Sequence, residues 1–148
     1  MLREKGLGFG MGNYQELIFY QKARQVVTAI DALIKIWPKT MQAQEISRQL
    51  FRSATSVGAN IAEGHGRHQG AEYVHYLIIA QRSANETEHW LDTAKDCGLG
   101  PNEKIDEIVR LNVGVARTVT STITTIRAKQ NQVIEEKADY LIDSSPDE

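Results

Sequence analysis

The sequence is poor in cysteine, in proline and in long apolar runs. Cys97 is the single cysteine, so no disulfide can form within the chain, and no neighbouring base suggests a nucleophilic role for its thiol. Because Gly98 follows at an expected helix end, we expect this thiol to be buried or half-buried. No apolar stretch approaches the roughly 20 residues of a membrane-spanning helix, and the chain begins without a basic and then apolar leader. These features predict a cytoplasmic protein with no membrane partner.

Excess positive charge is also missing from the chain as a whole, whose formal net charge is −2. The charge is uneven, however. Residues 1–67 carry nine Lys and Arg against five Asp and Glu, whereas residues 68–148 carry eight against fourteen. The composition therefore does not indicate a strongly basic nucleic-acid-binding protein, although the first half can carry a basic face.

The spacing of apolar residues predicts an all-α protein. Apolar residues recur at intervals of three and four in four segments, which are separated by Pro38, by glycines near residue 64, and by Gly98 with Pro101. We expect helices over about residues 13–37, 40–64, 70–97 and 102–130. Short turns between helices of this length favour an antiparallel up-down-up-down four-helix bundle. The glycine-rich residues 1–12 are expected to be a flexible leader, and residues 131–148 an acidic mobile tail.

The first predicted helix has a broader apolar face than a single packing seam requires. One row consists of Tyr20, Ala23, Val27, Ile30, Ile34 and Trp37, and a second row of Phe19, Val26 and Leu33 runs beside it. A face of this width suggests one neighbour inside the chain and another outside it. We therefore expect a homo-oligomer, and contacts that close by rotation would make it cyclic.

The stretch SVGANIAEGHGR, residues 56–67, is the most distinctive in the chain. A phosphate-binding glycine loop follows a strand and begins a helix, but these glycines lie at the expected end of the second helix. We expect Gly64 or Gly66 to close that helix in a left-handed conformation. A polar row at intervals of three and four accompanies it: Ser53, Ser56, Asn60, Glu63 and Arg67. The row is either a solvated face with a Glu63–Arg67 surface pair, or a helix or subunit interface in which Asn60 and Glu63 fix the register.

Two E-x-x-H motifs raise the question of a metal site. Glu72 with His75 and Glu86 with His89 repeat the ligand pattern of carboxylate-bridged di-iron bundles. Such a centre needs the two motifs on different helices, yet both fall on the third predicted helix, about 21 Å apart. We therefore expect no metal, no cofactor and no catalytic residue.

The helix pattern and the SVGANIAEGHGR stretch together make this sequence resemble a family of four-helix bundles. The family is typified by proteins encoded in intervening sequences of bacterial 23S ribosomal RNA genes. The family also includes the accessory variability determinant of diversity-generating retroelements. The resemblance covers about residues 13–127 and is most specific in Asn60, Ile61, Ala62, Glu63 and Gly64, followed by Gly66 and Arg67. The other residues that carry it are Tyr14, Glu16, Leu17, Gln21, Lys22, Ala23, Gln49, Leu50, Arg52, Ser53, Ala54, Glu72, Tyr73, Leu77, Ala80, Ser83 and Glu86.

The resemblance implies a small non-enzymatic bundle that assembles as a ring of five. If the chain is similar to the retroelement members, the resemblance further implies that basic surface binds a reverse transcriptase and nucleic acid. The members from ribosomal intervening sequences have no established activity. Three functions follow as alternatives: a scaffold associated with RNA or an RNA-handling partner, a structural protein-interaction oligomer without nucleic acid, and a disfavoured enzyme or metal-binding bundle. The candidate contacts for RNA or a partner are Lys22, Arg24, Arg48, Arg52 and Arg67.

Overall fold

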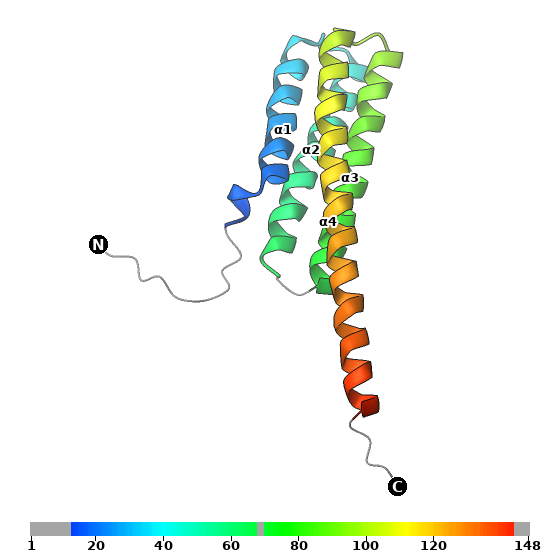
Figure 1. Ribbon diagram of the computed structural model, residues 1–148. Coiled ribbons are helices and arrows are strands. Elements are labelled where there is room, and N and C mark those ends of the chain that lie inside the picture. Colours follow the sequence, from blue (N-terminus) through cyan, green and yellow to red (C-terminus); the bar gives the residue numbers. More distant parts are fainter. Residues whose placement is uncertain (1–12, 68–69, 144–148) are drawn as a thin grey trace, which may run out of the picture.

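Four α-helices make up most of the protein, as a computed structural model shows (Figure 1). The structure describes residues 13–67 and 70–143, so the predicted leader and the last five residues of the predicted tail lie outside the described residues. The helices are α1 (Ile18–Ile36), α2 (Met41–His65), α3 (Gly70–Asp96) and α4 (Asn102–Asp143), and a short 3₁₀ turn, η1 (Tyr14–Glu16), precedes α1. The predicted all-α class and the four helices are confirmed.

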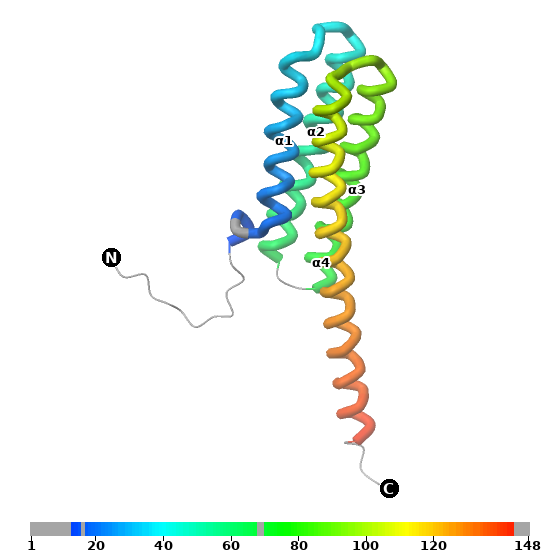
Figure 2. The backbone as a smooth tube through the Cα atoms, turned by 45° about the horizontal axis from the view of Figure 1, so that its top comes forward, coloured from blue at the N-terminus to red at the C-terminus, as the bar shows by residue number. Residues whose placement is uncertain are grey.

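Each helix runs antiparallel to the next, and α1 packs on both α2 and α4 while α3 packs on α2 and α4 (Figures 1 and 2). The core consists of the apolar stripes that face this common axis. Leu50, Ile61, Leu77, Leu91 and Ile105 have no exposed surface. Burying each such side chain contributes roughly 1.5–3 kcal/mol before conformational entropy is subtracted.

The two apolar rows of α1 occupy different depths. Phe19, Val26 and Leu33 are buried together with Ala23 and Ile30, whereas Tyr20, Val27 and Ile34 are only half-buried at the edge of the core. The second row is thus the one that faces the bundle. The first row is divided, since Ala23, Ile30 and Trp37 join the core while Tyr20, Val27 and Ile34 lie at its edge.

The helix ends follow from local chemistry. Thr40 caps α2, since its side chain accepts a hydrogen bond from the backbone of Ala43 at 3.2 Å. Pro38 ends α1 by holding Trp37 in an extended conformation. Gly98 follows α3 at φ +73°, and the backbone N–H of Leu99 reaches back to the carbonyl of Ala94 at 2.9 Å. This is the glycine-closed helix end expected from the sequence.

Two boundaries differ from prediction. The first helix begins at Ile18 rather than near Asn13, because Leu17 is extended (φ −66°, ψ 124°) and separates η1 from α1. The last helix continues to Asp143, so residues 131–143 are helical and project beyond the other three helices (Figures 1 and 2). The prediction of a mobile tail from residue 131 is therefore wrong for this part of the chain.

Candidate functional site

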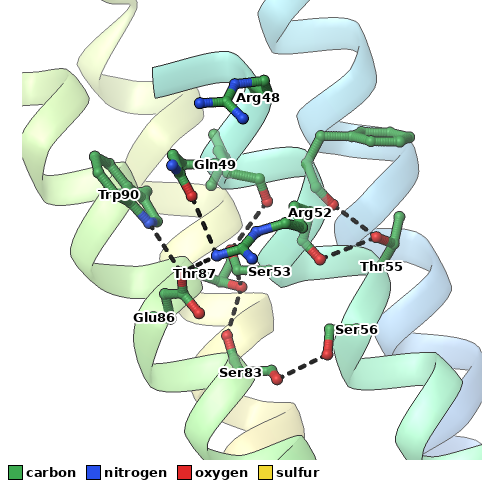
Figure 3. A network of polar contacts seen from close by, with 12 residues as sticks. Arg48, Gln49, Arg52, Ser53, Thr55, Ser56, Ser83, Glu86, Thr87 and Trp90 are labelled. Carbon is green, nitrogen blue, oxygen red and sulfur yellow. Dashed lines mark hydrogen bonds and ion pairs between the residues drawn. The ribbon is translucent and has the colours of Figure 1, made fainter. Parts of the chain in front are cut away.

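The five cations predicted to contact RNA or a partner lie on α1, on α2 and just after α2. All five side chains are exposed, and Arg48 and Arg52 stand one turn apart on α2 as expected (Figure 3). They do not form one basic patch of uncompensated charge, because three of the five meet carboxylates.

Arg48 and Arg52 each contact a glutamate. Arg48 Nη2 lies 2.8 Å from Glu45 Oε1 within α2. Arg52 Nη2 lies 3.3 Å from Glu86 Oε1 on α3, as Figure 3 shows. The hydrogen bond from Arg48 lowers the pKa of the Glu45 carboxyl, with a further contribution from Gln49. Glu86 also accepts a hydrogen bond from Trp90 Nε1 at 3.4 Å, so Arg52 belongs to a cross-helix polar contact.

Arg67 is held at the end of α2 by groups from both sides of the α2–α3 turn. Its guanidinium lies 2.7 Å from Glu63 Oε1, 3.7 Å from Glu72 Oε1, and above the Tyr76 ring with its central carbon 5.8 Å from the ring centre. The hydrogen bond to Glu63 is the main reason that the pKa of Arg67 is raised. The expected Glu63–Arg67 surface pair is thus present.

Lys22 and Arg24 differ from these three. Neither has a carboxylate within 4.0 Å among the described residues. Arg24 lies at a groove of about 220 Å³ between α1 and α2, here called the α1–α2 groove. Its other main lining residues are Tyr20, Val27, Thr55, Gly58 and Ala59. Half-buried residues of α1 and the small residues of α2 therefore meet beside Arg24, which has no carboxylate partner among the described residues.

The segment Asn60–Gly64 has a structural explanation residue by residue. Asn60 Nδ2 donates to the Ser56 carbonyl at 2.8 Å and lies 3.1 Å from Ser56 Oγ. Ile61 is completely buried, Ala62 is half-buried and Glu63 is exposed. The segment therefore combines one core residue with an asparagine that bonds within α2 and a glutamate that pairs with Arg67 just after it.

Gly64 is required by close packing rather than by backbone conformation. A Cβ on Gly64 would lie 2.7 Å from Tyr76 Cβ and 3.1 Å from Tyr73 Cδ2, so the end of α2 approaches α3 more closely than any other residue allows. Gly66 has φ −69° and ψ −16°, and Gly98 is the one described glycine with positive φ. The expectation that Gly64 or Gly66 closes α2 in a left-handed conformation is therefore wrong.

A largely buried row of hydroxyl groups joins α2 to α3. We define the α2–α3 polar seam as Ser53, Ser56, Ser83 and Thr87 (Figure 3). The hydroxyls of Ser56 and Ser83 lie 3.0 Å apart, and Thr87 Oγ1 donates to Ser53 Oγ at 3.0 Å. The interface interpretation assigned the contact with another helix to Asn60 and Glu63, but in the structure Ser53 and Ser56 meet α3. Asn60 bonds within α2, and Glu63 forms the surface pair with Arg67. Ser83 and Thr87 could have been recognised as the partners only by knowing which face of α3 meets α2.

Several of the described titratable residues form ion pairs at the surface. Both E-x-x-H motifs lie on α3, and Glu86 forms an ion pair with Arg52 and accepts a hydrogen bond from Trp90. No group of three or more His, Cys, Asp or Glu in residues 13–67 and 70–143 is arranged to hold a metal ion. Cys97 is exposed, contrary to expectation, and directly follows Asp96, the last residue of α3.

None of the described helices is long and apolar enough to cross a membrane. The model of one protein family, described as 23S rRNA-intervening sequence protein, matches residues 15–121. The chain belongs to this family. The matched region contains α1 to α3, the α2–α3 polar seam and the first half of α4, and it ends before the projecting part of α4.

Solved structures agree with the family assignment. One similar structure is a protein of unknown function from the S23 ribosomal protein family of Bacteroides thetaiotaomicron, with 28% sequence identity and a TM-score of 0.64. The match covers 72% of this chain and 98% of that chain. A search of curated proteins finds no match. The likeness therefore reaches the whole of the related protein but leaves over a quarter of this chain outside it.

Proposed function

We propose that this protein is a non-enzymatic scaffold that assembles into a homo-oligomer, a ring of five copies, and acts through contacts with other macromolecules. The observation that carries the proposal is the α1–α2 groove, where half-buried apolar residues of α1 meet Thr55, Gly58 and Ala59. Gly58 leaves space there, since a Cβ at this position would meet only the Tyr20 ring, at 3.6 Å. A groove of small residues lets a helix of another copy approach closely, and a heterologous contact of this kind closes into a ring.

The polar groups elsewhere support a binding role over a chemical one. Arg48, Arg52 and Arg67 hold carboxylates at the surface, and the α2–α3 polar seam satisfies its hydroxyls internally. A catalytic group would instead need to converge with a nucleophile, a base or a metal in a cleft. The proposed function therefore requires no cofactor.

A second candidate function is a scaffold that also binds RNA or an RNA-handling protein such as a reverse transcriptase. Lys22 and Arg24 favour it, because they are exposed and unpaired within the described residues while the remaining three candidate arginines are already paired. Binding through such cations is dominated by counterion release and weakens steeply with salt.

Native mass spectrometry on protein purified without nuclease, at low and then high ionic strength, tests both functions. A bare oligomer at both salt concentrations supports the protein-interaction scaffold. Extra nucleic-acid mass that is lost at high salt supports the second candidate. A monomer at micromolar concentration in both conditions contradicts the scaffold.

A further inference from the structure

The C-terminal part of α4 stands apart from the bundle that the family shares. The contact of α4 with α3 reaches Gln130, whose side-chain amide fills the space beside Gly70 that a Cβ would take. Every described residue from 131 to 143 is exposed. We call residues 131–143 the α4 extension. It lies beyond the family match at residues 15–121, so its role is not given by the family assignment.

The α4 extension is amphipathic, and its apolar face continues the buried face of α4. Ile123 is buried and Ile126 is partly buried against the bundle, and the same interval of three and four leads on through residues 130, 133, 137 and 140. Val133, Ile134 and Tyr140 are nevertheless 48%, 63% and 75% exposed. A repeat of this kind is a coiled-coil seam, with residues 130 and 137 in one core position and 133 and 140 in the other.

The charges along the seam identify its partner. Residues 124–134 contain two charged residues, Arg127 and Lys129, and both are positive. Residues 135–143 contain one positive residue, Lys137, and four negative ones: Glu135, Glu136, Asp139 and Asp143. A parallel copy would place acidic end against acidic end. An antiparallel copy places the basic end of each helix against the acidic end of the other. A parallel pair is disfavoured, because it brings like charges together.

We propose that residues 130–141 pair antiparallel with the same segment of a second copy of this chain. The proposed register sets residue 130 opposite residue 140 of the partner subunit and residue 133 opposite residue 137, so the two-fold axis passes close to residue 135. Ile134 then lies near Ile134 of the partner subunit, close to the two-fold axis, and Lys129 lies within one helical turn of Asp143 of the partner subunit. Gln130 and Lys137 are the polar members of the seam, and polar residues at such positions restrict register at a cost in stability.

Sedimentation velocity on the full chain and on a chain ending at Gln130 gives the first measurement. We expect the full chain to show an association step that doubles the mass of whatever unit the truncated chain forms. Equal masses for the two chains at all concentrations would overturn the proposal. The α1–α2 groove is intact in the truncated chain, so loss of the proposed ring and loss of this pairing are measured separately.

Charge exchange tests the register. Lys129→Glu and Asp143→Lys should each weaken the association roughly tenfold, because two symmetric pairs become repulsive. The double variant should restore it. Residues 129 and 143 are about 21 Å apart on one helix, so recovery cannot arise within a chain. A double variant no stronger than the single variants would overturn the antiparallel register.

Disulfide trapping in a Cys97→Ala background separates the two orientations. Ile134→Cys should give linked dimers under mild oxidation, and Tyr140→Cys should give few, because residue 140 faces residue 130 of the partner subunit. Equal trapping at both positions indicates a parallel pair and contradicts the proposal. All these substitutions are at exposed sites, so an unchanged helical circular dichroism signal confirms that each variant is folded.

Discussion

Thr87 on α3 donates a hydrogen bond to Ser53 on α2, with 3.0 Å between the two side-chain oxygens. Thr87 has no exposed surface and Ser53 is 2% exposed, so water cannot replace either partner. Thr87 Oγ1 also lies 2.8 Å from the Ser83 carbonyl, and Ser53 Oγ lies 3.1 Å from the Leu50 carbonyl. The α2–α3 polar seam is therefore satisfied as a unit and fixes how the two helices align.

Thr87→Val should lower the free energy of unfolding by about 1–3 kcal/mol, because it leaves a buried hydroxyl without its donor in a nearly unchanged volume. The double variant Ser53→Ala with Thr87→Val should cost less than the sum of the two single changes. Urea unfolding of the four proteins measures this coupling.

Thr93→Val provides the matched control on the same helix, since its hydroxyl bonds to the His89 carbonyl at a solvent-exposed site. It should change stability by less than about 0.5 kcal/mol. Additive effects at positions 53 and 87 would show that the two hydroxyls act independently.

The two glycines of α2 should respond in opposite ways to alanine. Gly64→Ala places a methyl group 2.7 Å from Tyr76 Cβ, and we expect a net loss of roughly 1–3 kcal/mol as α2 and α3 move apart. Gly58→Ala meets only an ordinary contact and should be neutral or stabilising by up to about 1 kcal/mol through helix propensity. Thermal unfolding of the two variants measures the difference, and equal destabilisation would contradict the close-packing explanation for Gly64.

Much of this fold follows from local signals. The four helices, their apolar faces and the glycine-closed end of α3 can be predicted because each depends on residues within a few positions of one another. The pairing of Arg52 with Glu86 and of Ser53 with Thr87 cannot, because in both cases the partner is 34 residues away and only the packing of α2 on α3 selects it. The acidic composition of residues 131–148 similarly favours a prediction of disorder, although an amphipathic repeat within it supports the α4 extension.

If RNA binds, Lys22 and Arg24 should carry more of the salt dependence than Arg48 and Arg52. Each phosphate contact on single-stranded RNA contributes a slope of about −0.7 in a plot of log binding constant against log salt. Lys22→Ala with Arg24→Ala should therefore flatten the slope by about 1.4 if both cations contact phosphate. Arg48→Ala with Arg52→Ala is the matched control and should change it less, since Glu45 and Glu86 already neutralise those charges.

Fluorescence anisotropy with a labelled oligonucleotide, titrated at several salt concentrations, measures both slopes. A larger change in the Arg48 and Arg52 variant would place the nucleic-acid surface on the α2–α3 side of the bundle. An equal effect of the two double variants would mean that the ion pairs seen in the structure open on binding.

Tyr73 should make stability fall at alkaline pH. It is half-buried at the α2–α3 turn, with its ring 6.2 Å from that of His65 and in contact range of Gly64, and burial raises its pKa above 10.0. The unfolded chain therefore releases this proton at a lower pH than the folded chain does. The contribution to stability is complete below pH 10 and declines as the pH rises through the folded-state pKa, with a limiting slope of about 1.4 kcal/mol per pH unit.

Tyr73→Phe removes this ionisation while keeping the ring in place. Urea unfolding at several pH values between 9 and 12 gives the free energy of unfolding of both proteins. We expect the variant to gain stability relative to the native chain as the pH rises. Tyr140→Phe, at a position 75% exposed, is the control for changes that any tyrosine would cause. Curves for the native chain and Tyr73→Phe that stay parallel across this range would mean that the Tyr73 hydroxyl reaches water when ionised, and that the α2–α3 turn opens without loss of the bundle.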